Sequence, residues 1–168
     1  MKRITIILAL VLACASAAVA QKFALVDMDY ILKNVPQYEM ANEQLNQLSQ
    51  RWQKEVEAVG KEAENMYQAY LAEKVFLTEE QVKKREADVV AKEKEATELR
   101  YKYFGPEGEL YKKRQSLMKP IQEDVYNAVK KVSEERGYQM ILDRASSSDI
   151  IFASPRIDVS NEVLSKLG

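Results

Sequence analysis

The fold is decided by one stretch, YEMANEQLNQLSQRWQKEVEAVGKEAENMYQAYLAEKVFLTEEQ, which spans residues 38–81. Its apolar residues recur at spacings of three or four, the pattern by which a helix packs a continuous seam against another helix. The seam positions are Ala41, Leu45, Leu48, Trp52, Val56, Val59, Ala63, Met66 and Tyr70. Two successive spacings of four around Trp52 form a stutter, which locally unwinds a coiled coil. A helix from Tyr38 to Leu77 would be about 60 Å long at 1.5 Å per residue, so it must project from a compact domain of this size.

The end of this stretch predicts a turn and a second helix. Thr78 and Gln81 match the capping box, in which two residues satisfy each other's free backbone N–H groups at a helix start. Because almost no linker separates Leu77 from Thr78, the simplest geometry is an antiparallel hairpin with its tip near residues 77–78. The returning helix has a poorer seam, with apolar residues at Val82, Val89 and Ala96 among many charged neighbours. We therefore expect the distal hairpin to be weakly packed and flexible.

Residues 104–108, Phe-Gly-Pro-Glu-Gly, interrupt the returning helix. Glycine loosens the backbone, and proline removes a hydrogen-bond donor, so the second helix should end here and a third should begin at Pro106. Counted back from the tip, Gly105 falls opposite Gln50, close to the stutter. The break is either a helix boundary or a hinge that lets the arm open. The candidate hinge residues are Trp52, Gly105, Pro106 and Gly108.

The two ends of the chain carry short runs of strand character. They are residues 23–26, 138–143 and 150–153, and we expect the last two to pair as a hairpin across the polar turn at 146–149. Asp27 or Asp29 should cap a brief helix, and Asp158 should cap a final one. The residues expected to build this body are Phe23, Leu25, Val26, Met140, Ile141, Leu142, Ile150, Ile151 and Phe152.

Taken together, these patterns predict an α+β fold. A small β-sheet body forms from residues 21–37 and 137–168, and a long antiparallel α-helical coiled-coil hairpin, the arm, forms from residues 38–136. Three short strands and a few helical turns bury little apolar surface, and bodies of this size are marginally stable alone. Association with further copies is the expected remedy, and it would leave several arms around a common space.

Residues 1–20 have the features of a secretory signal peptide. Lys2 and Arg3 precede an apolar run from Ile4 to Ala13, and small residues lead up to Ala20. The apolar run is shorter than the roughly 20 residues needed to cross a membrane, so we expect cleavage after Ala20 and export to the periplasm. An alternative uses Cys14 as the lipidated first residue of a lipoprotein, but Leu12 fits that cleavage box poorly.

Composition excludes several classes of function. Removing residues 1–20 takes away the one cysteine and two of the 25 basic residues, and leaves all 26 acidic ones, so the mature chain is slightly acidic and has no nucleic-acid footprint. The chain has no histidine, no nucleotide-binding glycine loop and no metal-ligand cluster. Capping explains Asp27 and Asp29 more simply than acid–base chemistry. We therefore expect no catalytic residues, no cofactor and no metal.

The order of these segments resembles the Skp/OmpH family in its Bacteroidota-like form. The matching pieces are residues 23–28, the charged hairpin, Gly105-Pro106 followed by residues 117–121, residues 137–143 and residues 158–167. The resemblance implies a jellyfish-like homotrimer with a β-rich body and three helical arms around a cavity. It also implies a function: a periplasmic chaperone that holds unfolded outer-membrane β-barrel proteins without ATP.

One departure from the family changes the expected chemistry of binding. The best-known members are strongly basic, whereas this mature chain is slightly acidic, so electrostatic capture of clients is in doubt. Tyrosine offers a wide amphipathic face and methionine adapts its shape, so both suit promiscuous binding. The candidate client-binding residues are Met66, Tyr67, Tyr70, Tyr101 and Tyr103. Met66 and Tyr70 lie on the seam and would more often pack against the partner helix, which leaves Tyr67 and Tyr101 as the better candidates.

The rival interpretation is a structural or adaptor coiled coil that bridges components of the cell envelope. Both interpretations require the hairpin, and they differ in whether the arm holds unfolded polypeptide. Whether the chain also contacts the membrane or lipopolysaccharide stays open at the level of sequence.

Overall fold

The computed structural model describes residues 22–147 and 149–168, so the predicted signal peptide and Cys14 lie outside the described residues. Two compact units emerge. We call residues 36–123 the arm, and residues 22–35 with 124–168 the body. The sequence predicted the first boundary between residues 37 and 38, two residues later than in the structure. It predicted the second between residues 136 and 137, whereas the structure divides the chain between 123 and 124. None of the described helices is both long and apolar enough to cross a membrane.

The arm begins with α3, which spans Pro36–Glu73. Proline suits the first turn of a helix because its missing N–H would have no partner there. The sequence seam is confirmed, because its residues are the ones α3 buries: Ala41, Leu45, Trp52, Val56, Ala63 and Tyr70 are buried, and Leu48, Val59 and Met66 are half-buried. At 38 residues, α3 is about 57 Å long.

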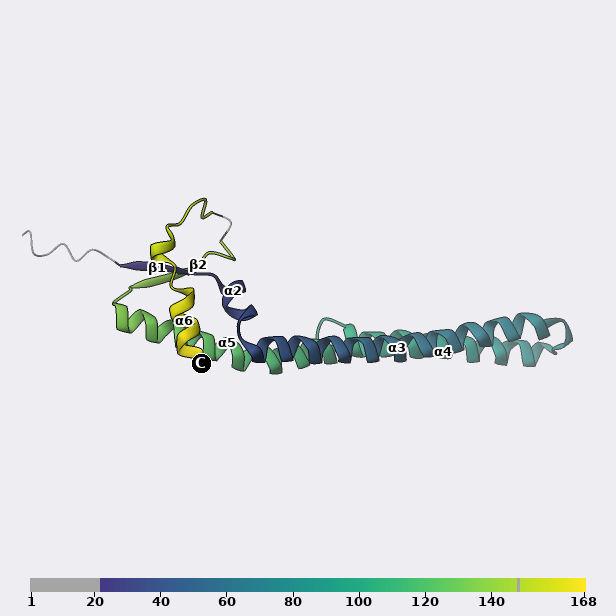
Figure 1. Cartoon of the computed structure of the whole chain (residues 1–168). Helices are drawn as coiled ribbons and strands as arrows, with labels where there is room; N and C mark the ends of the chain where they lie inside the picture. The colour runs from purple at the N-terminus through teal and green to yellow at the C-terminus, as the bar shows by residue number, and fades with distance from the viewer. Residues whose placement is uncertain (1–21, 148) are drawn as a thin grey trace, which may run out of the picture. The chain divides into compact units, whose positions relative to one another are not determined.

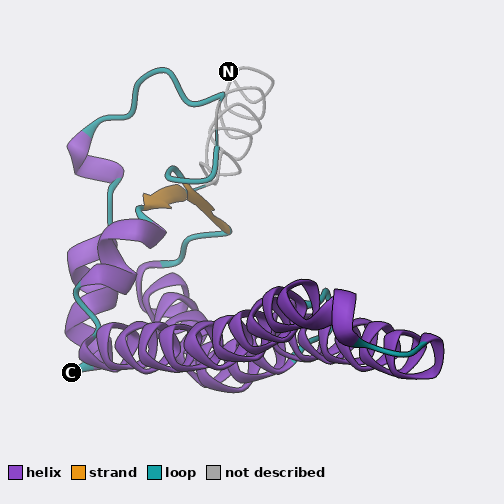
Figure 2. Ribbon diagram, turned by 90° about the vertical axis from the view of Figure 1, so that its right-hand side faces the viewer, coloured by secondary structure: helices purple, strands orange, loops and turns teal. Residues whose placement is uncertain are grey.

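A short 3-10 turn, η1 (Lys74–Phe76), leads to α4, which spans Glu79–Phe104. The predicted capping box is present: the Gln81 N–H donates to Thr78 Oγ1 at 3.3 Å, and the Thr78 N–H donates to Gln81 Oε1 at 2.9 Å. In the arm, α3 and α4 lie side by side and run in opposite directions (Figure 1 and Figure 2). The chain turns between η1 and α4, at residues 77–78.

The seam of α4 is thin, as its sequence predicted. Only Val89 and Tyr103 are buried in this helix. Polar contacts to α3 add to the packing: the Tyr70 hydroxyl donates to Glu86 Oε1 at 2.5 Å, and the Lys92 ammonium lies 3.3 Å from Glu62 Oε2. An ion pair near the surface contributes little to stability, so the row of apolar contacts and the Tyr70–Glu86 hydrogen bond hold the distal arm.

The break in the returning helix is also present. α4 ends at Phe104 and α5 spans Glu109–Arg136, so the third helix begins three residues later than the predicted start at Pro106. The Gly105 N–H still donates to the Tyr101 carbonyl at 2.8 Å, and the Gly108 N–H donates to the Gly105 carbonyl at 2.9 Å. Residues 105–108 thus form a tight turn instead of a first helical turn.

The body is built around β1, which spans Phe23–Val26. It pairs in parallel with β2, Met140–Asp143, in a register that places Phe23 opposite Met140. On its other side β1 receives the segment around Asp158, and the Val159 N–H donates to the Leu25 carbonyl at 2.9 Å. The last three residues of β1, Ala24, Leu25 and Val26, are buried.

Short helices complete the body. The first, α2 (Met28–Lys33), is capped by Asp27, whose Oδ1 accepts the Tyr30 N–H at 2.8 Å, and Asp29 lies in its first turn. The last, α6 (Ser160–Leu167), packs against α2. Its N-cap position is Val159, while Asp158 accepts the Ser160 N–H at 2.9 Å, so the predicted cap is displaced by one residue. The most buried large side chains of this unit are Ile31, Val125, Val132, Val159 and Val163.

The predicted hairpin between residues 138–143 and 150–153 is wrong for the single chain. Met140–Asp143 instead pairs with β1, and residues 150–153 form no strand. The physical reason is a long-range competitor: β1 is buried beneath the body's apolar residues, and parallel pairing with it extends through Arg144, whose N–H donates to the Val26 carbonyl at 2.8 Å. Ile151 and Phe152 are left 101% and 84% exposed.

Candidate functional site

The candidate client-binding residues divide into two groups. Tyr70 and Tyr103 are buried between the arm helices, and Met66 is half-buried. Tyr67 and Tyr101 are exposed, as their positions off the seam predicted. The structure does not bring the five residues together on one surface, so the exposed pair remains available for binding and the buried pair serves packing.

Tyr103 belongs to the core at the helix break. Its ring stacks on Trp52 with centroids 4.8 Å apart and planes within 6°, and its hydroxyl donates to Glu55 Oε1 at 2.9 Å. The hydrogen bond to Glu55, with burial second, raises the pKa of the Tyr103 hydroxyl. The surrounding apolar residues are Leu48, Val56, Leu99 and Leu110. The sequence carried a signal for this, because the spacing of seven from Val82 through Val89 and Ala96 continues to position 103.

The hinge candidates cluster around this core. A Cβ atom added at Gly108 would lie 2.8 Å from the Tyr103 carbonyl oxygen and 2.9 Å from that of Lys102, and one added at Gly105 would collide with the Tyr101 carbonyl oxygen. Both glycines are therefore required by the tightness of the turn. Whether this turn acts as a hinge stays a prediction, since stacking and close packing describe one conformation.

The tip of the arm carries an apolar surface that the sequence analysis did not single out. Tyr67 and Leu71 lie four residues apart on one face of α3, and Val75 and Phe76 follow in the 3-10 turn η1. Val75 is 82% exposed and Phe76 is 85% exposed. We call these four residues the tip patch. Their signal in the sequence was an apolar run, Val75-Phe76-Leu77, that precedes a capping box and has no place in the seam.

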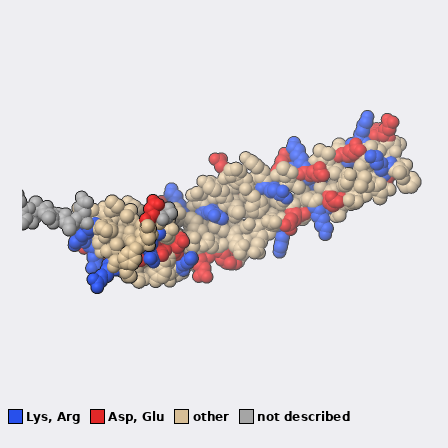
Figure 3. Space-filling model, turned by 90° about the horizontal axis from the view of Figure 1, so that it is seen from above, with Lys and Arg blue, Asp and Glu red and all other residues tan. Residues whose placement is uncertain are grey.

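Charges on the arm do not favour one sign of ligand. On the face shown in Figure 3, basic and acidic side chains are interspersed along the arm instead of forming a single-sign field. Arg85 pairs with Glu73 at 3.1 Å, and Lys74 approaches Glu86 at 3.9 Å. Apolar contact is accordingly the main force that the tip patch offers a partner.

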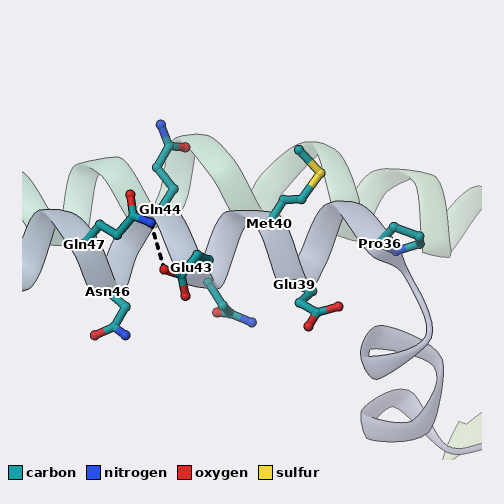
Figure 4. Close-up of a pocket in the computed structure, with 8 residues that line it drawn as sticks. Pro36, Glu39, Met40, Glu43, Gln44, Asn46 and Gln47 are labelled. Atoms are coloured by element: carbon teal, nitrogen blue, oxygen red, sulfur yellow. Dashed lines mark hydrogen bonds between the residues drawn. The ribbon is translucent and has the colours of Figure 1, made fainter.

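Concave surfaces on the arm are shallow. A groove of about 770 Å³ follows the first turns of α3, where Met40 and Gln44 point to one side of the helix and Glu39 and Asn46 to the other (Figure 4). Gln47 donates to Glu43 within it at 2.8 Å. This lining presents no set of converging charged groups. Within the described ranges there is also no cluster of three or more side chains placed to hold a metal ion.

The body concentrates its polar contacts at the ends of its strands. Arg144 lies 3.1 Å from Asp27 Oδ2 and 3.3 Å from Asp158 Oδ2, and Asp143 Oδ1 accepts the Met28 N–H at 3.1 Å. Burial alone would raise the pKa of Asp143, but hydrogen bonds from Ser146 and from backbone N–H groups together outweigh it and hold the pKa below its usual value. These contacts connect strand ends and helix starts, which is a structural role.

Comparison with known proteins identifies the fold. The family described as outer membrane protein (OmpH-like) matches residues 22–167. A crystal structure from Caulobacter crescentus, described as that of a candidate OmpH-like outer membrane chaperone, superposes with a TM-score of 0.71 at 14% identity, covering 86% of this chain and 82% of that one. None of the curated proteins compared is similar enough to match.

Proposed function

Because this chain belongs to the OmpH-like family, we propose that it is a periplasmic holdase chaperone, which binds unfolded outer-membrane β-barrel proteins and prevents their aggregation without ATP. It performs no catalysis in this proposal. The observation that carries it is the tip patch, where Val75 and Phe76 are more than four-fifths exposed at the end of a long helical hairpin. Exposed apolar side chains of this size usually mark a surface that another molecule covers.

The chemistry of the tip patch suits an unfolded barrel protein. Such a chain presents many short segments with alternating apolar residues, each of which binds weakly. Tyr67 adds an amphipathic ring that contacts apolar and polar groups alike, and its place beside Leu71 extends the patch along the helix. Occupied segments could not pair with one another, and such pairing of exposed strand edges is the usual route to aggregation.

Assembly of three copies would strengthen these weak contacts. The sheet has two strands within the described residues, so β2 keeps one edge without a neighbour, and Ile151 and Phe152 lie exposed in the same unit. These features support a homotrimer joined through its bodies. Once one arm holds a segment, the other arms act at high effective concentration, and many weak contacts sum to firm capture while each stays mobile.

Aggregation assays test this function directly. A barrel protein diluted from urea should stay clear when about one trimer per client is present and nucleotide is absent. Unchanged turbidity would favour the adaptor alternative, in which the arms bridge envelope components and hold no unfolded chain.

The role of the tip patch is tested by replacing Leu71, Val75 and Phe76 with serine. Because these side chains are exposed, helicity should be unchanged, while the amount of chaperone needed for half-suppression should rise several-fold. Met40→Ser is the control, since Met40 is 71% exposed on α3, the helix that also carries Leu71, but is far from the tip in sequence. Equal effects of the triple variant and the control would remove the tip patch from the proposal.

A further inference from the structure

A second concave surface on the arm lies at the helix break. It has a volume of about 430 Å³ and is lined by Leu48 and Trp52 of α3 and by residues of the first two turns of α5. The α5 residues are Glu109, Lys112, Lys113 and Ser116. We call it the Trp52 groove. Its volume falls within the range of sites that take a small ligand or a single large side chain.

The floor of the Trp52 groove is apolar and rigid. Trp52 is held by its stack on Tyr103, and Leu48 packs against the same cluster while staying half-buried. A flat, fixed indole edge beside a branched aliphatic side chain is complementary to another aromatic or large aliphatic group. The floor thus selects for an apolar side chain and loses little conformational freedom on binding it.

The rim of the groove carries an unbalanced positive charge. Glu109 and Lys112 form an ion pair at 3.4 Å. Lys113 is half-buried, and no ion pair links it to any residue of the ranges 22–147 and 149–168. Because no described residue pairs with it, the Lys113 ammonium can donate charge-assisted hydrogen bonds to an incoming carboxylate, whereas Lys112 is already paired with Glu109.

We propose that the Trp52 groove is a binding subsite for polypeptide segments in which a large apolar side chain stands next to a carboxylate. This inference rests on the proposed holdase function, which supplies unfolded polypeptide as the ligand. The apolar side chain packs on Leu48 and the edge of Trp52, and the neighbouring carboxylate accepts hydrogen bonds from the Lys113 ammonium. The groove would select client segments that carry this pair of neighbouring side chains, whereas the tip patch would bind apolar segments of any kind.

A polypeptide fits the groove better than a lipid does. The groove is short and open to solvent, and the cationic Lys113 lines it together with the apolar Leu48 and Trp52. An acyl chain needs a long apolar channel, which the lining residues do not form. A dipeptide unit carries its apolar and acidic side chains on neighbouring residues, which matches an apolar floor whose lining includes a lysine.

Trp52 is the only tryptophan of the chain and reports on occupancy through its fluorescence. The probes are capped tetrapeptides with the central pairs Phe-Asp, Phe-Asn and Ala-Asp, added to the full-length mature protein. The Phe-Asp peptide should change the emission saturably. The Phe-Asn peptide should bind about fivefold more weakly, because the charge-assisted hydrogen bond to Lys113 is lost, and the Ala-Asp peptide should give no saturable change.

Lys113→Gln should weaken Phe-Asp binding to the level of Phe-Asn and leave Phe-Asn binding unchanged. Lys112→Gln is the matched control, because that lysine already has a partner in Glu109. Equal affinities of the two phenylalanine peptides for the unmodified protein would overturn the proposal. A saturable change with phosphatidylglycerol vesicles but with none of the peptides would also overturn it in favour of a lipid site.

The outcome separates this subsite from the holdase function. If turbidity is suppressed but no peptide changes the Trp52 emission, the subsite is wrong and the function stands. If the peptides bind with the expected dependence on Lys113 and turbidity is unchanged, the subsite stands and the holdase function is wrong.

Discussion

At the scale of single residues, the space around each glycine determines whether an alanine can replace it without a loss of stability. Gly60 lies in the middle of α3, and a Cβ atom built there meets nothing within 4 Å. Gly60→Ala should therefore raise the free energy of unfolding by about 0.5–1 kcal/mol, because alanine loses less backbone entropy in a helix. Gly108→Ala should lower it by about 1–3 kcal/mol, because the added methyl group presses on carbonyl oxygens that cannot move freely.

Urea unfolding followed by circular dichroism, at one protein concentration, measures both changes. The two variants control each other, since each adds the same methyl group to the arm. A loss of stability at Gly60, or none at Gly108, would contradict the arrangement of the helix and of the turn at 105–108.

Asp143 gives a prediction of pH dependence at the same scale. Its pKa is lower in the folded protein than in the unfolded chain, so its contribution to stability is fully present above the unfolded value of about 4 and is lost as pH falls through the folded value. Asp143→Asn keeps the oxygen that accepts the Met28 N–H but removes the charge. The difference in unfolding free energy between the two proteins should be largest near pH 7 and should shrink toward pH 3. A difference of constant size across this range would contradict the role of the charge.

At the scale of helices and strands, the sequence predicted what local patterns determine. The seam of α3, the capping box at Thr78 and the interruption after Phe104 each depend on residues within a few turns of one another, and all three are present. The burial of Tyr70 and Tyr103 follows from the same heptad spacing. For Tyr70 the seam position already favoured packing, whereas the assignment of Tyr103 as a binding residue weighed side-chain chemistry above helix geometry. The structure buries both side chains.

The pairing of the strands could not be predicted, because it depends on contacts between residues that are distant in the sequence. Residues 138–143 have strand propensity, but their partner, β1, lies more than a hundred residues earlier in the chain. The short polar turn at 146–149 favoured a local hairpin, and the sequence contains no feature that weighs a local partner against a distant one. The tip patch was missed for a different reason: the apolar run at residues 75–77 is visible in the sequence, but its exposure depends on where α3 and α4 stop touching.

At the scale of the whole molecule, assembly can be separated from capture by mutation. If copies join through their bodies, Ile151 and Phe152 should pack against a neighbouring copy. Replacing both with serine removes these apolar contacts. The particle mass measured by light scattering should then fall from that of a trimer toward that of a monomer. Helicity should fall little, since residues 150–153 form no helix.

Serine replacement of Val75 and Phe76 at the tip is the matched control, because it removes an equally exposed apolar pair from the arm. This control should keep the trimer mass and lose client suppression. The body variant should also lose suppression when it dissociates, since single arms lack the effective concentration that joined arms provide. A body variant that remains a trimer would exclude residues 151 and 152 from the interface. A monomer that suppresses aggregation as well as the trimer would show that capture needs one arm alone.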